Sequence, residues 1–204
     1  MRHIVLTFGT LAVFGLVACS SPAPQPAEPV ETTPAAQTPP TAEPAAAPTS
    51  DEGMITSAMS AAPEPIAREA TIMTVDDKGQ MKHLREGSNG WTCMPDMPST
   101  PGPDPMCVDA GGMEWAGAWM AHKNPPAGKM GFGYMLAGGS DASNTDPFAT
   151  APAAGESWVT TGPHVMVFNI GDRYVGYPTT AGDTSKPYVM FPNTAYAHLM
   201  IPVK

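Results

Sequence analysis

The chain has few basic residues and few cysteines. Its 10 Lys and Arg face 19 Asp and Glu, so the formal net charge is −9, and only three cysteines are present. This acidic balance leaves no basic patch to neutralise phosphates, which argues against nucleic acid and anionic lipid head groups as partners. Charged residues make up only 14% of the chain, while 20 Gly and 25 Pro favour strands and turns over long solvated helices.

The local signatures of common enzymes are also missing. The sequence contains no GxSxG, HExxH or CxxC motif and no phosphate loop with its GK pair. We therefore expect no enzyme, although an active site built on His83, His122 or a pair of Asp residues stays open.

Acidic residues offer two weaker possibilities. Asp96, Asp104 and Asp109 could supply paired carboxylates for glycoside hydrolysis, but acidic residues in turns and caps usually serve solvation. Asp141, Ser143 and Thr145 alternate as calcium ligands do, yet the Gly and the distal Glu of a calcium loop are missing.

The first 18 residues predict a secretory signal, because Arg2 precedes an uncharged apolar run that is too short to span a bilayer. The run ends in Leu16-Val17-Ala18-Cys19, which resembles the lipobox of bacterial lipoproteins. The resemblance implies that Cys19 receives a diacylglyceryl group and anchors the protein to a membrane. An ordinary signal peptide remains the alternative. Ser20, where an inner-membrane lipoprotein carries Asp, favours the periplasmic face of the outer membrane in the cell envelope.

Once Cys19 is used by lipid, Cys93 and Cys107 are left as an even pair. In an oxidising compartment such a pair is expected to form a disulfide, closing a loop of about fifteen residues. Two reduced buried thiols are the alternative.

The composition divides the chain into four segments. Residues 1–18 are the signal, and residues 19–52 combine the lipidated Cys with a tether rich in Pro, Ala and Thr, which we expect to be disordered. Residues 53–69 form a short helical lead-in, and residues 70–204 form a single β-rich globular domain.

Within that domain, the alternation of apolar and polar residues and the positions of turn residues predict short strands around one helix. Asp109 caps this helix, which ends before Asn124. Residues 138–156 read as a long surface loop. The fold class is β-rich α+β, with a small antiparallel sheet or sandwich and one packed helix. The expected strands cover residues 70–75, 80–86, 91–93, 130–137, 158–160, 164–170, 188–191 and 197–203.

Several segments of the domain look like parts of uncharacterised secreted bacterial proteins. They read LREGSNGWTCMPD, DPMC, GYML, SNTDP and AYAHLMIPV. This resemblance covers much of residues 70–204 and implies no particular chemistry.

One pattern suggests a ligand. Fourteen of the 15 methionines follow residue 53, and two segments repeat a His-x-Met spacing: His164 with Met166, and His198 with Met200. Residues two apart share a face of a strand, so neighbouring strands would bring two imidazoles and two thioethers together. That soft set suits Cu(I), although methionine also packs ordinary cores. Met94, Met97 and Met106 could form a second, looser thioether cluster.

Two functions follow. The first is a lipid-anchored, non-enzymatic binding or interaction module, whose partner is an envelope protein or a small ligand that meets Trp91, Tyr134, Trp158 or the long loops. The alternative is periplasmic Cu(I) binding through the paired His-x-Met strands.

Overall fold

The computed structural model describes residues 47–203. The predicted signal, the lipobox with Cys19 and nearly all of the tether lie outside the described residues. No helix in the described range is both long enough and apolar enough to cross a membrane.

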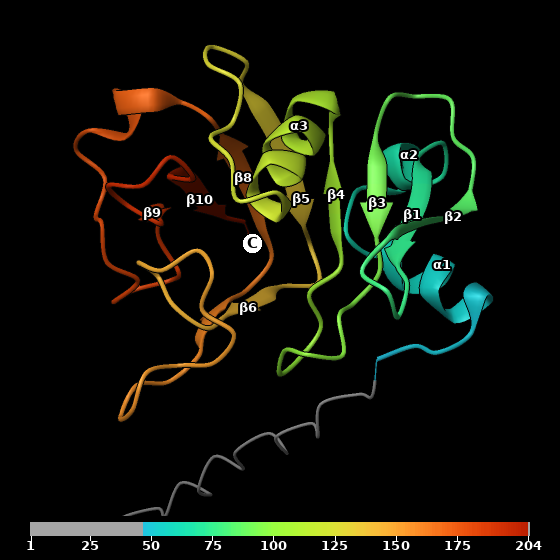
Figure 1. The fold of residues 1–204 in the computed structure, drawn as a ribbon, viewed down its shortest axis with the longest axis horizontal. Coiled ribbons are helices and arrows are strands. Elements are labelled where there is room, and N and C mark those ends of the chain that lie inside the picture. Colours follow the sequence, from blue (N-terminus) through green and yellow to red (C-terminus); the bar gives the residue numbers. More distant parts are fainter. Residues whose placement is uncertain (1–46, 204) are drawn as a thin grey trace, which may run out of the picture. The chain divides into compact units, whose positions relative to one another are not determined.

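The described chain forms a mixed sheet of eight strands, a separate pair of strands, three α-helices and one 3-10 helix (Figure 1). The order across the large sheet is β2-β1-β3-β4-β5-β8-β10-β9, and β6 pairs with β7. The helices are α1 (Asp51–Met59), α2 (Glu64–Ala67), α3 (Ala110–Met120) and the 3-10 helix η1 (Gly171–Tyr174). The strands are β1 (Thr71–Val75), β2 (Met81–Arg85), β3 (Thr92–Met94), β4 (Met106–Val108), β5 (Gly131–Met135), β6 (Gly139–Asp141), β7 (Val159–Thr161), β8 (His164–Phe168), β9 (Tyr188–Met190) and β10 (His198–Pro202).

The predicted β-rich α+β fold with a packed helix is confirmed. The sheet is larger than expected and not wholly antiparallel, because the chain crosses over after β2 and β3 then runs parallel to β1. The helical lead-in expected over residues 53–69 consists of two short helices, α1 and α2, and Pro65 lies in the first turn of α2.

Residues 138–156 are not simply a surface loop, so that prediction is wrong. Gly139–Asp141 form β6, which pairs with β7, and Ser140 and Ala142 are buried. The hydroxyl of Ser140 donates to the carbonyl of Pro101 at 2.8 Å, which fixes this segment against the loop that follows β3.

Helix α3 packs against the sheet at very short range. Its N-cap is Asp109, as predicted, and the Asp109 carboxylate accepts from the backbone N–H of Gly112 at 2.8 Å and of Phe132 at 3.0 Å. A Cβ atom on Gly131 would collide with the backbone of α3, so the glycines of β5 permit the close approach that their spacing suggested.

The spacing of Met113, Ala116, Gly117 and Met120 predicts that these residues share one side of α3, but the structure buries a different set. Gly111, Gly112, Trp115 and Ala116 are buried, whereas Met120 is 46% exposed. The close glycine contact with β5 turns this set of residues toward the sheet.

The two faces of the sheet bury different side chains. On one face, α1, α2 and the turns beside them cover Ile72 and a disulfide between Cys93 and Cys107, which lie opposite each other in β3 and β4. On the other face lie α3, Val108, Phe168 and a series of methionines. The expected disulfide is therefore present.

Candidate functional site

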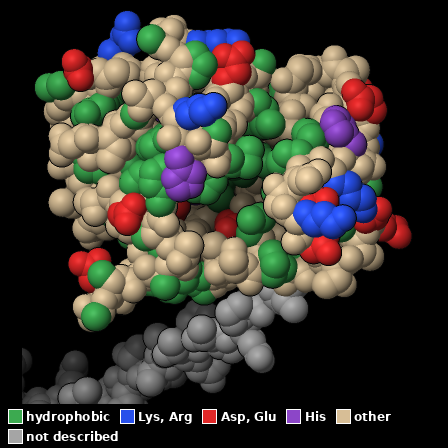
Figure 2. Space-filling model, in the orientation of Figure 1, with side chains coloured by type: hydrophobic (Ala, Val, Ile, Leu, Met, Phe, Trp, Pro, Cys, Tyr) green, Lys and Arg blue, Asp and Glu red, His purple; other side chains and the backbone are tan. Residues whose placement is uncertain are grey.

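A pocket of about 690 Å³ lies on the α3 side of the sheet. Figure 2 shows this side of the molecule hollowed, with hydrophobic side chains around the hollow and an acidic side chain inside it. The walls are the sheet, α3, the loop between the two disulfide cysteines and the segment after β6. Eight methionines line it: Met94, Met97, Met106, Met113, Met120, Met135, Met166 and Met200.

Strand alternation explains why methionine dominates the floor of the pocket. Met94 lies opposite Met106 in β3 and β4, and Met166 lies opposite Met200 in β8 and β10. Their sequence neighbours point to the other face, because successive side chains of a strand alternate. Five adjacent or nearby strands thus supply Met94, Met106, Met135, Met166 and Met200 to one wall.

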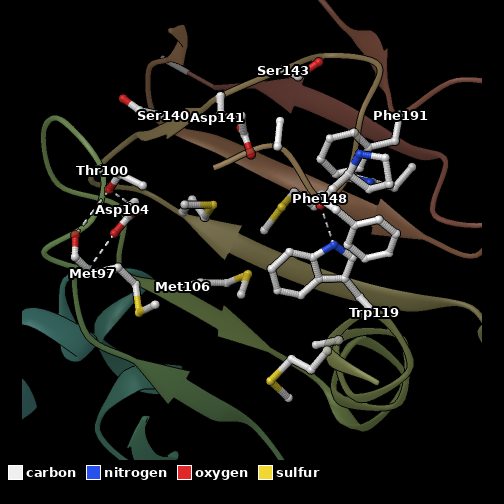
Figure 3. A pocket seen from close by; sticks show the side chains of 18 of the residues that line it. Met97, Thr100, Asp104, Met106, Trp119, Ser140, Asp141, Ser143, Phe148 and Phe191 are labelled. Atoms are coloured by element: carbon white, nitrogen blue, oxygen red, sulfur yellow. Dashed lines mark hydrogen bonds between the residues drawn. The ribbon is translucent and has the colours of Figure 1, made fainter. Parts of the chain in front are cut away.

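One end of the pocket is acidic (Figure 3). Asp104 accepts from the backbone N–H of Met97 at 2.8 Å and from the Thr100 hydroxyl at 2.6 Å, and its own N–H donates to Asp96 at 2.9 Å. The pKa of Asp104 is raised to about 6, mainly by burial and to a smaller extent by the neighbouring Asp96. These bonds hold the loop between the cysteines in place.

Asp141 reaches the same end from β6. Its side chain is half-buried and lines the pocket. Within the described residues its carboxyl makes no hydrogen bond (Figure 3). The pKa of Asp141 is raised to about 7, mainly by burial and to a smaller extent by the nearby Asp104. A fraction of the molecules therefore carries a protonated Asp141 near neutral pH.

The other end is aromatic. Trp115 stacks on Phe168 with ring centroids 4.6 Å apart, and its indole N–H is buried without a partner among the described residues. Trp119 donates from Nε1 to the carbonyl of Pro147 at 2.8 Å, and His122 stacks on Phe148 at 4.0 Å. The segment after β6 is thereby attached to α3 across the pocket.

The four predicted copper ligands lie on one face of two neighbouring strands, but they do not form one cluster. Met166 faces Met200, whereas His164 is opposite Pro202 and His198 is opposite Phe168. The backbone positions of the two histidines therefore lie at opposite ends of the pair, four residues apart along the strands, or about 13 Å by the usual rise per residue. His198 lines the pocket and His164 does not. The described residues contain no group of three or more His, Cys, Asp or Glu arranged to hold a metal.

Both histidines are neutral and share one tautomer. Nδ1 of His164 donates to the Gly162 carbonyl at 2.8 Å, and Nδ1 of His198 donates to the Tyr196 carbonyl at 3.0 Å, since a carbonyl can only accept. Burial lowers the pKa of His164, and it lowers the pKa of His198 to about 4. In each ring Nε2 keeps a free lone pair, and that of His164 is buried with no partner among the described residues.

The weaker sequence candidates are dispersed. Asp96 and Asp104 are neighbours, but Asp109 is the cap of α3. The hydroxyls of Ser143 and Thr145 lie 3.3 Å apart and bond within their own turn. His83 is exposed, with Nδ1 3.6 Å from a carboxylate oxygen of Glu86, while His122 lines the pocket.

The aromatic residues expected at a binding face divide between the two sides. Trp91 and Tyr134 pack on each other, with centroids 5.3 Å apart, against the cluster beneath α1 and α2. Trp158 lines the pocket. The methionine excess is the sequence signal with the most residues in this site, and Trp158 and His122 also line it.

Comparisons of the chain with known protein families, with curated proteins and with solved structures gave no match.

Proposed function

We propose that this chain is a lipid-anchored binding protein of the cell envelope, and that it holds a small apolar molecule in the methionine-lined pocket. The observation that carries the proposal is a space of about 690 Å³ whose lining includes eight methionines and six Trp or Phe side chains. Its volume is within the range of small-molecule sites, and apolar lining with a few polar groups is their usual character.

Methionine suits such a site. Its unbranched chain and polarisable sulfur adapt to ligands of different shape, and methionine is common at binding surfaces that accept several partners. A folded domain with no ligand would normally fill a space of this size with its own side chains, because protein interiors are close-packed. The lipobox resemblance, with Cys19 as the lipid site, is what supports the location at the outer membrane facing the periplasm.

The test is binding of N-phenyl-1-naphthylamine, a neutral apolar dye whose fluorescence rises in apolar surroundings. The protein is the full chain with Cys19→Ser, which removes the lipid attachment. Ala116→Phe on α3 fills the pocket, because Ala116 is 7% exposed and lines it. Ala121→Phe places the same ring at the exposed end of α3, outside the lining.

We expect saturable, one-to-one binding of the dye, unchanged in Ala121→Phe and weakened at least about tenfold in Ala116→Phe. Near-ultraviolet circular dichroism establishes that both variants are folded. Equal binding by the two variants would place the dye elsewhere and overturn the proposal.

Cu(I) binding is the second candidate. It is favoured by the Met166–Met200 pair together with His198, whose Nε2 is not used by the Tyr196 hydrogen bond. Two thioethers and an imidazole suit a soft cation.

The separation of the two histidines supplies a matched pair of variants. Titration of Cu(I) against a chromogenic chelator should show binding that His198→Ala removes and His164→Ala retains. Binding that survives His198→Ala, or none in the unsubstituted protein, would rule out this site.

A further inference from the structure

Asp104 and Asp141, two of the three carboxyl groups that line the pocket, lie at one end and have no cationic partner there; the third, Asp146, accepts from the backbone N–H of Phe148. Asp104 comes from the loop before β4 and Asp141 from β6, two elements of the chain that are far apart in sequence but meet at this end. They are close enough for the charge of Asp104 to act on Asp141. Among the described residues that line the pocket there is no Lys or Arg. His198 is neutral, because burial keeps its pKa at about 4.

A buried carboxylate without a counter-charge is unfavourable. The carboxylate of Asp104 is stabilised by the two hydrogen bonds that it accepts, and these bonds support the loop. The carboxyl of Asp141 lines the cavity and makes no hydrogen bond within the described chain. An unpartnered acidic group directed into an apolar pocket indicates what the ligand should bring.

Resting on the proposed function, we propose that the ligand is an amphipathic cation, an alkyl or aryl amine whose ammonium group pairs with Asp141 beside Asp104. Its apolar part then lies along the methionine wall toward Trp115 and Trp119. An ammonium group would supply both the hydrogen-bond donors and the positive charge that Asp141 lacks, and such charge-assisted bonds are the stronger kind.

One further feature agrees with a cation. The net charge of −9 concentrates cations near the protein surface. A fatty acid is disfavoured, because its carboxylate would lie beside two acidic groups.

The test compares three probes with the same twelve-carbon tail: dodecylamine, dodecanol and dodecanoate. Each is titrated below its aggregation limit into the full chain with Cys19→Ser, and binding is measured by isothermal titration calorimetry at pH 7.5. The variants are Asp141→Asn and Asp77→Asn. Asp77 lies in an exposed turn outside the pocket, so Asp77→Asn removes one negative charge without changing the site.

We expect dodecylamine to bind at least about tenfold more tightly than dodecanol, and dodecanoate to bind most weakly. Asp141→Asn should bring the amine close to the alcohol, while Asp77→Asn leaves the difference in place.

The experiment distinguishes a failure of the proposed function from a failure of the cationic-ligand assignment. If none of the three probes binds, the proposed function fails. If dodecanol or dodecanoate binds as well as dodecylamine, or if Asp141→Asn leaves the preference for the amine intact, the pocket is an apolar site and the assignment of a cationic ligand is wrong.

Discussion

Cys93 and Met94 are neighbours in β3, yet they enter opposite environments. Cys93 is fully buried in a cluster of small side chains, where it is bonded to Cys107 and covered by five buried alanines from the segment of α1 and α2. Met94 lines the pocket on the other face. Similar strand geometry therefore supports a filled core on one side and an open cavity on the other.

The difference lies in the length of the side chains and in what covers them. Alanine brings the first two helices close to the sheet, and the disulfide joins two strands beneath them. On the other face α3 is held close to β5 by glycine, but it covers only part of the methionine wall. The first face stabilises the domain, and the second is available for binding.

The largest expected effect is a difference in stability between the two faces. Ile72→Ala, at a fully buried position of the alanine-rich face, should lower the free energy of unfolding by about 2–5 kcal/mol. Met106→Ala, which only enlarges an existing cavity, should lower it by about 1 kcal/mol. Urea unfolding followed by tryptophan fluorescence measures both. Equal losses would mean that the pocket is packed as tightly as the core.

An intermediate effect is expected from Asp141, with the opposite sign. Its pKa is raised from 3.8 to about 7 by burial and by Asp104, so the folded protein binds more protons than the unfolded chain between about pH 4 and 7. Stability should therefore fall as pH rises through this range. The titrating group that acts on Asp141 is Asp104, which raises its pKa. Asp141 in turn acts on Tyr188, whose pKa is raised mainly by burial.

Asp141→Asn removes this term. The variant should be more stable than the unsubstituted protein at pH 7 by on the order of 2 kcal/mol, and the two should converge near pH 4. Thermal unfolding across pH 4 to 7.5 measures the difference, with Asp77→Asn as the matched loss of one exposed charge. A stabilising substitution that impairs amine binding would identify Asp141 as a residue kept for its ligand. A destabilised Asp141→Asn would mean that the carboxyl supports the fold instead.

The elements were predictable where the signal is local. The β-branched run of β1, the turn at residues 76–79 and the alternation of β2 predicted the first hairpin, and Asp109 predicted the start of α3. The inward face of α3 was not predictable, because it depends on the contact between Gly111 and the backbone of β5. That contact joins residues that are about twenty positions apart.

The site was predictable in its chemistry but not in its shape. The methionine excess and the shared face of His164, Met166, His198 and Met200 follow from composition and a period of two. The predicted convergence of all four side chains requires the two repeats to lie directly opposite each other along the two strands. In an antiparallel pair, aligning Met166 with Met200 sends the two histidines to opposite ends. The pocket depends on the strand order β4-β5-β8-β10, which is set by pairing between strands that are far apart in the sequence.

The smallest expected effect concerns the cover of the pocket. Trp119 attaches the segment after β6 to α3 by one partly exposed hydrogen bond to Pro147, and Trp119→Phe removes that bond while keeping a ring that can stack on Phe148. One such bond contributes about 1 kcal/mol, so amide exchange at Phe148 and Ala149 should quicken by about fivefold at most. Exchange followed by mass spectrometry detects this change, and Trp91→Phe on the alanine-rich face should leave these amides unaffected. If the amides are insensitive to Trp119→Phe, this bond does not hold the cover, and the aromatic contacts alone separate the pocket from solvent.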